Sequence, residues 1–94
     1  MTDSPFANVP VEEDTRVCAS RETAFGDWLV LHQTWTWDGT RAESLIFLAD
    51  DVAHLDDETL QRMVGASPLA RPGGSITVAR ERDGYTFVNF NFDY

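Results

Sequence analysis

Three dipeptides that join glycine to aspartate punctuate the chain and most constrain its fold. They are Gly26-Asp27, Asp38-Gly39 and Asp83-Gly84, and β-branched and aromatic residues flank each of them. Such dipeptides supply the positive φ angles that tight hairpin turns require. Because each turn joins two neighbouring antiparallel strands, the sequence predicts a mostly antiparallel protein.

The central turn sets the register of the strands around it. A two-residue loop at Asp38-Gly39 places Trp37 opposite Thr40, and a loop at Gly26-Asp27 makes residues 16–25 the strand before it. Side chains alternate between the faces of a sheet, so one face is mostly apolar and we expect it to form the core. This face holds Leu29, Leu31, Gln33, Trp35, Trp37, Ile46 and Leu48. The other face, which we expect to be covered only at its base, holds Trp28, Val30, Leu45 and Phe47, then His32, Thr34, Thr36, Arg41 and Glu43.

The last hairpin admits two registers. A two-residue loop at Asp83-Gly84 sets Val78 opposite Asn89, whereas a three-residue loop of residues 82–84 sets Val78 opposite Val88, which we prefer because it pairs apolar residues. The inner face is then Ile76, Val78, Val88, Phe90 and Phe92, and the outer face is Tyr85, Phe87, Asn89 and Asn91. Exposed aromatic side chains beside asparagines indicate a contact surface. The candidate aromatic interface consists of Tyr85, Phe87, Trp35 and Trp37.

The only helical pattern lies between the hairpins. Apolar residues recur at approximately helical spacing from Val52 to Val64, and Gly65 follows them. The helix begins at Asp50 or only at Asp56, since either position offers acidic residues for its first turn.

The predicted fold class is therefore α+β. An antiparallel β-meander of three strands, one α-helix and a C-terminal β-hairpin form a single sheet with the helix packed on one face. Residues 16–94 form this single α+β domain, and residues 1–15, which lack an apolar period, form a mobile N-terminal arm. The expected core is Leu29, Leu31, Ile46, Leu48, Leu60, Met63, Val64, Ile76, Val78, Val88 and Phe90.

The charge of the chain is strongly negative and unevenly distributed. Sixteen acidic residues and seven arginines, with no lysine, give a net charge of -9. Residues 1–58 hold thirteen acids and three arginines, a balance of -10, while residues 59–94 have a balance of +1. The densest acidic group is Asp50, Asp51, Asp56, Asp57 and Glu58. Capping of a helix and favourable placement in its dipole explain some of these acids, and docking of an arginine- or lysine-rich partner explains all five.

Other site chemistries have weaker support. Asp50, His54 and Glu58 have the spacing of one helix face and could hold a divalent ion, but three ligands on one exposed helix bind weakly, so no metal and no cofactor is expected. Cys18 is the only cysteine, and it lies out of register with His32, so no nucleophilic pair and no enzymatic activity is expected. Aromatic strands hold single-stranded nucleic acid when basic residues accompany them, but the acidic charge makes direct nucleic-acid binding unlikely despite Arg71, Arg80 and Arg82.

Three classes of function stay open. The leading hypothesis is a non-enzymatic, cytoplasmic protein-interaction module whose acidic face binds a basic protein surface, as an inhibitor, an immunity protein or a nucleic-acid mimic does. The first alternative is a homo-oligomeric structural or accessory subunit whose interface is the aromatic face, which includes the C-terminal strand, with acidity due to a halophilic or high-GC background. The second is a binder of small ligands or single strands on the aromatic face. No membrane-spanning run or signal segment is recognisable.

Overall fold

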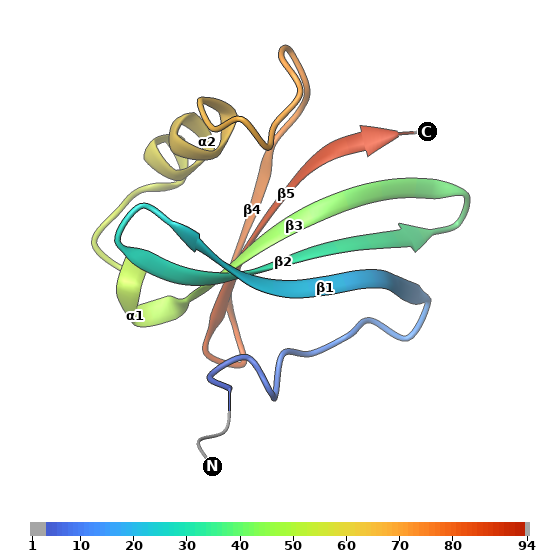
Figure 1. Ribbon diagram of the computed structural model, residues 1–94, viewed down its shortest axis with the longest axis horizontal. Helices are drawn as coiled ribbons and strands as arrows, with labels where there is room; N and C mark the ends of the chain where they lie inside the picture. The colour runs from blue at the N-terminus through green and yellow to red at the C-terminus, as the bar shows by residue number, and fades with distance from the viewer. Residues whose placement is uncertain (1–3, 94) are drawn as a thin grey trace.

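A computed structural model describes residues 4–93, except for the side chains of Glu81 and Arg82. A five-stranded antiparallel sheet has the strand order β1-β2-β3-β5-β4, and two short helices lie between β3 and β4 (Figure 1). The elements are β1 (Thr15–Phe25), β2 (Trp28–Trp37), β3 (Thr40–Leu48), α1 (Ala49–Val52), α2 (Asp57–Gly65), β4 (Thr77–Arg82) and β5 (Tyr85–Asp93). The α+β class with an antiparallel sheet is confirmed, whereas the single predicted helix is two helices.

The first two turns form as their residues predict. Asp38 and Gly39 both have positive φ angles, of 47° and 80°, which is the pattern of a two-residue turn whose twist matches that of its strands. Trp37 lies opposite Thr40, and Phe25 lies opposite Trp28. The predicted register of β1, β2 and β3 is therefore confirmed at these pairs.

The last hairpin has the preferred register but a different loop. Arg82 lies opposite Tyr85, so the turn has two residues, and the three-residue loop is wrong. A bulge between Ala79 and Arg82 then shifts the register, so that Val78 lies opposite Val88 as predicted. An extra residue in one strand of a pair changes the register without changing the turn.

A second irregularity reverses two side chains of β5. Asn91 has a φ of 54°, and the pairing between β3 and β5 shifts at this point. The Asn91 side chain consequently bonds to Glu43 on the same face as Phe90, while the Phe92 ring packs edge-on against Trp35 on the opposite face. The predicted strict alternation of Phe92 inward and Asn91 outward is wrong, because one residue in the left-handed region interrupts it.

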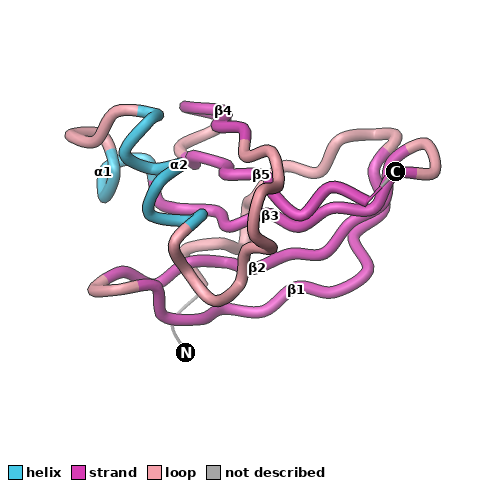
Figure 2. The backbone as a smooth tube through the Cα atoms, turned by 90° about the horizontal axis from the view of Figure 1, so that it is seen from above, coloured by secondary structure: helices cyan, strands magenta, loops and turns pink. Residues whose placement is uncertain are grey.

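The main core lies on the face that the sequence analysis left partly open. We call it the helix face, because α2 packs there (Figure 2). Its buried cluster consists of Val30, Leu45, Phe47, Val52, Leu60, Val64, Val88 and Phe90. Leu29 and Trp37, which were expected in the core, are 45% and 50% exposed on the opposite face. The expectation was wrong because it counted apolar residues along the strands without knowing which face the helix covers.

The N-terminal segment covers the opposite face, which we call the arm face. Residues 4–14 form no helix or strand, but Phe6 is buried and stacks on Tyr85 with 6.1 Å between ring centroids. The Tyr85 hydroxyl donates a 2.6 Å hydrogen bond to the Pro5 carbonyl. Leu31 and Ile46 complete this second buried cluster. The contacts give the segment a defined place on the sheet, and its mobility stays a prediction.

The C-terminal strand is an interior strand. β5 lies between β3 and β4, so both hydrogen-bonding sides of its first half are occupied within the chain. Pairing of two chains through this part of β5 would require displacement of a neighbouring strand. The edge strand β1 instead carries Arg16, Arg21 and Glu22, charges of the kind that discourage pairing of sheet edges.

Leu45→Ala and Leu29→Ala test whether the main core lies on the helix face, as in the structure, or on the face of Leu29, as the sequence predicted. Leu45 is fully buried on the helix face, so its truncation should lower the free energy of unfolding by about 2 to 5 kcal/mol. The same truncation at the exposed Leu29 should cost less than about 1 kcal/mol. Urea denaturation of both variants measures the difference, and an equal loss would contradict this placement of the core.

Phe6→Ala tests the docking of the N-terminal segment. Loss of the ring contact with Tyr85 should release residues 4–14, so the amides of Ala7 and Val9, which bond to Ser4 and Phe6 carbonyls, should exchange hydrogen faster. Hydrogen exchange followed by NMR measures this effect. Val11→Ala is the control, because Val11 is exposed and its truncation should leave these amides protected.

Candidate functional site

The predicted acidic group is assembled at one end of the molecule. Asp50 and Asp51 lie on α1, Asp56 precedes α2, and Asp57 and Glu58 lie in its first turn. All of them except Asp51 line one open concavity of about 610 Å³ together with Arg80. The structure therefore gathers four of the five residues around a shared surface, which we call the acidic concavity.

Asp56 separates the two helices. Its backbone is extended, and its side chain accepts a 2.8 Å hydrogen bond from the Thr59 backbone N–H, which makes it the N-cap of α2. Hydrogen bonds from the Thr59 side chain and backbone lower the pKa of Asp56 below its ordinary value. Because the helix is interrupted here, Asp50, His54 and Glu58 do not share one helix face, and within residues 4–93 no three potential ligands gather into a metal site.

Arg80 fixes the connection between the helices. Its Nε donates a 2.8 Å hydrogen bond to Asp57, and its two terminal nitrogens donate to the carbonyls of Val52 and Leu55. The guanidinium thus binds α1, the connection and α2 to strand β4. The sequence analysis considered Arg80 as part of a basic patch, but its guanidinium forms hydrogen bonds within the chain, to Asp57, Val52 and Leu55.

The acidic concavity keeps a negative balance after these contacts. Glu58 pairs with Arg62 on the surface of α2, and Asp57 pairs with Arg80. Asp50 and Asp51 have no ion pair or hydrogen bond among the described residues. Four carboxylates and one guanidinium, that of Arg80, therefore line the acidic concavity, and the carboxylates of Asp50 in it and of Asp51 beside it on α1 are free to bind another cation.

The predicted aromatic interface is divided by the N-terminal segment. Tyr85 is only 6% exposed beneath Phe6, so the N-terminal segment covers it, and a role of Tyr85 in binding a partner stays a prediction. Its ring is covered because the sheet buries apolar residues on both faces. Phe87 and Trp35 are half-buried and line one cleft, while Trp37 is exposed and lines an adjoining groove with Trp35.

The cleft lies between the N-terminal segment and the sheet and encloses about 120 Å³. Trp35 Nε1 donates a 2.7 Å hydrogen bond to the Ser44 hydroxyl, which donates a 2.6 Å bond to the Asn89 side-chain oxygen. These bonds fix the Trp35 ring. Gln33 also lines the cleft; it is 9% exposed, and its amide has no hydrogen-bond partner among the described residues.

The adjoining groove has a volume of about 430 Å³ and an acidic wall. Its lining residues are Glu12, Glu13, Asp14, Thr15, Trp35 and Trp37. Glu12, Thr15 and Trp35 also line the cleft, so the two hollows are continuous. We refer to the outer hollow as the tryptophan groove.

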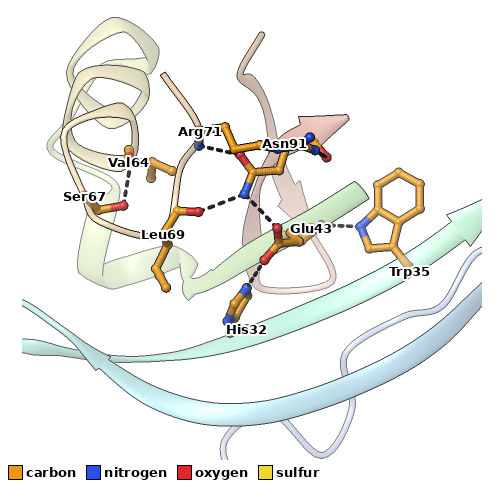
Figure 3. Close-up of polar contacts among 9 residues, drawn as sticks. His32, Trp35, Glu43, Val64, Ser67, Leu69, Arg71 and Asn91 are labelled. Carbon is orange, nitrogen blue, oxygen red and sulfur yellow. Dashed lines mark hydrogen bonds and ion pairs between the residues drawn. The ribbon is translucent and has the colours of Figure 1, made fainter. Parts of the chain in front are cut away.

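A polar network lies on the helix face beyond α2. His32 Nε2 and Glu43 are 2.7 Å apart, and the other Glu43 oxygen accepts a 2.7 Å hydrogen bond from the Asn91 amide (Figure 3). The same amide donates to the Leu69 carbonyl, and its oxygen accepts from the Arg71 backbone N–H. The network therefore attaches the loop after α2 to strands β2, β3 and β5.

Sequence reasoning missed the polar floor of the cleft. Gln33 was placed on an apolar face without a role, and Ser44 was not considered. A signal was present, since polar residues that interrupt apolar strand faces often have a binding or structural role. Their convergence was not predictable, because it depends on the course of the N-terminal segment.

Comparison of the chain with protein-family models, with curated proteins and with solved structures finds no match. In the part of the chain that the structure describes, neither helix has the length and apolar character needed to span a bilayer. The geometry of the acidic concavity and of the tryptophan groove is therefore the basis for assigning a function.

Arg80→Ala tests whether this residue holds the acidic concavity together. The substitution leaves two backbone carbonyls without their donor, so we expect a loss of about 1 to 3 kcal/mol in the free energy of unfolding. Arg62→Ala removes an exposed ion pair and should cost less than about 1 kcal/mol. Thermal and urea unfolding of both variants provide the comparison. Equal losses of unfolding free energy would show that Arg80 does not hold α1, the connection and α2 against β4; we call this role the Arg80 clamp.

Proposed function

We propose that this protein is a non-enzymatic interaction module whose acidic concavity binds a basic surface of a partner protein. The observation that carries the proposal is the convergence of Asp50, Asp56, Asp57 and Glu58 on one open hollow of about 610 Å³. A concave surface with one sign of charge concentrates the field and raises the rate at which an oppositely charged partner associates.

The charge of the whole chain supports the same proposal. A net charge of -9 steers a cationic partner from a distance of about one Debye length, which is roughly 10 Å at 0.1 M salt. The Arg80 clamp supports it further, because carboxylates held on a fixed backbone lose less conformational freedom when they bind. Inhibitors, immunity proteins and nucleic-acid mimics are classes of protein that use such a surface.

The two alternatives have less support from the geometry. A homo-oligomer that pairs through the first half of the C-terminal strand has to displace β3 or β4 from β5. A binder of single strands on the aromatic face has to accommodate phosphates beside Glu12, Glu13 and Asp14, which repel them. A binder of a cationic ligand on that face is compatible with these charges.

The test compares two charge-matched double variants as baits for proteins of the organism that makes this chain. Asp50→Asn with Asp51→Asn removes the two unpaired carboxylates of α1. Asp38→Asn with Asp93→Asn removes the same charge from the β2–β3 turn, at the opposite end of the sheet from α1, and from the end of β5 (Figure 1). Asparagine tolerates the positive φ of position 38, so the turn should be retained.

A specific partner should be captured by the wild type and by the Asp38/Asp93 variant, and should be reduced several-fold with the Asp50/Asp51 variant. Its capture should also fall steeply between 0.1 and 1 M salt, over which the Debye length decreases from about 10 to 3 Å. Quantitative mass spectrometry of the captured proteins measures both effects. Capture that is the same for the two variants would refute binding through the acidic concavity.

A further inference from the structure

We propose that the tryptophan groove binds an arginine side chain of a protein partner. The groove lies between residues 12–15 and strand β2, and it places two indole rings beside three consecutive acidic residues. The inference concerns a different surface from the acidic concavity. It depends on the proposed function only in taking the source of the cation to be a basic protein.

The charge of the groove selects a cation. Glu13 and Asp14 have no ion pair or hydrogen bond among the described residues. The acidic concavity differs, since Arg62 and Arg80 neutralise part of its charge. A bound guanidinium would therefore relieve the repulsion between the Glu13 and Asp14 carboxylates.

The two tryptophans favour a flat cation. Trp35 is held in place by its hydrogen bond to Ser44 and by the edge-on contact of Phe92, while Trp37 is 50% exposed. A guanidinium stacks on an indole face and directs its N–H groups outward in the plane of the group, where carboxylates can accept them. An ammonium group lacks this planar arrangement, so arginine fits the groove better than lysine.

The cleft below the groove offers a ligand a polar side chain. Gln33 is nine-tenths buried at its floor, and its amide lacks a partner among the described residues. Among the described residues no side-chain nitrogen or oxygen is buried without a partner, so solvent reaches the Gln33 amide, which can form a hydrogen bond with water or with a ligand in the cleft. The volume of about 120 Å³ accommodates several waters or a planar group of a few heavy atoms. Because Trp35 borders both hollows, a chain that places arginine in the groove can present a polar group to Gln33.

The test is an NMR titration of the three indole N–H resonances with acetyl-arginine amide. Trp28 packs against Phe47 in the core of the helix face, so its resonance is an internal control within the same molecule. We expect saturable shifts of the Trp35 and Trp37 resonances and none of Trp28. Acetyl-citrulline amide has the same shape without the charge, and it should cause no saturable shift. The lysine probe, Nα-acetyl-lysine amide with a free ammonium group, should bind more weakly than the arginine probe.

Two variants identify the groups responsible. Trp37→Ala should weaken binding of the arginine probe by roughly two- to fivefold, as expected for an exposed cation–π contact. Glu13→Gln with Asp14→Asn should weaken it by at least roughly twofold through the loss of exposed charge pairs. Asp50→Asn with Asp51→Asn is the matched charge control and should leave the affinity unchanged at constant salt. Both groove variants change exposed residues, and their amide spectra show whether they fold.

The outcomes separate this inference from the proposed function. Equal shifts for arginine and citrulline, shifts no larger than those of Trp28, or an affinity insensitive to Glu13→Gln with Asp14→Asn would each overturn the arginine site. These results would leave the acidic concavity untouched, because its test uses Asp50 and Asp51. Conversely, equal capture by the Asp50/Asp51 and Asp38/Asp93 variants, together with intact arginine binding, would overturn only the proposal that the acidic concavity binds a partner. Saturable binding of the lysine probe as tight as that of arginine would show a general cation site and would contradict the selection for a planar group.

Discussion

The structure depends on a sheet that buries apolar side chains on both of its faces. Val30, Leu45 and Phe47 project toward α2, and Leu31 and Ile46 project toward the N-terminal segment. One short amphipathic helix covers only one face, so an irregular stretch of eleven residues, 4–14, serves as the second cover. Such a stretch leaves hollows beside it, because it lacks the regular side-chain spacing that interdigitates with a sheet. The cleft and the tryptophan groove follow directly from this division of the covering.

The strand register was predictable from the sequence because it depends on local chemistry. Asp38-Gly39 specifies a tight turn whatever lies around it, and the period-two alternation of β2 and β3 then follows. The assignment of the core face was not predictable in the same way, since strands with two apolar faces do not indicate which face the helix will cover. Bulges were a second source of error. The irregularity at Asn91 reverses Phe92, and no signal in a single sequence marks it clearly.

In the candidate sites, too, residues that are neighbours in the sequence were predictable, and residues that meet only through the fold were not. The acidic residues near α2 were recognisable because a helix N-terminus gathers them in sequence, and Asp56 caps it as its residue type suggests. Arg80 was not recognisable as their partner, since it lies 23 residues beyond Asp57 and reaches it only through the packing of β4. Gln33 and Glu13 likewise belong to one region only because residues 4–14 fold back over the sheet. Functional residues that meet across such distances require the three-dimensional structure.

Asn91 illustrates how strictly one position of this fold restricts its amino acid. Its backbone lies in the left-handed region, where glycine and asparagine are tolerated far better than other residues. Its amide hydrogens both have acceptors, the Glu43 carboxylate and the Leu69 carbonyl, and its oxygen accepts from Arg71. Glycine would satisfy the backbone but would leave three polar groups without partners, and aspartate would place a second carboxylate against Glu43. Only asparagine meets both demands, so in any collection of functional variants of this protein position 91 should be among the least variable, although it is neither hydrophobic nor part of either proposed binding surface.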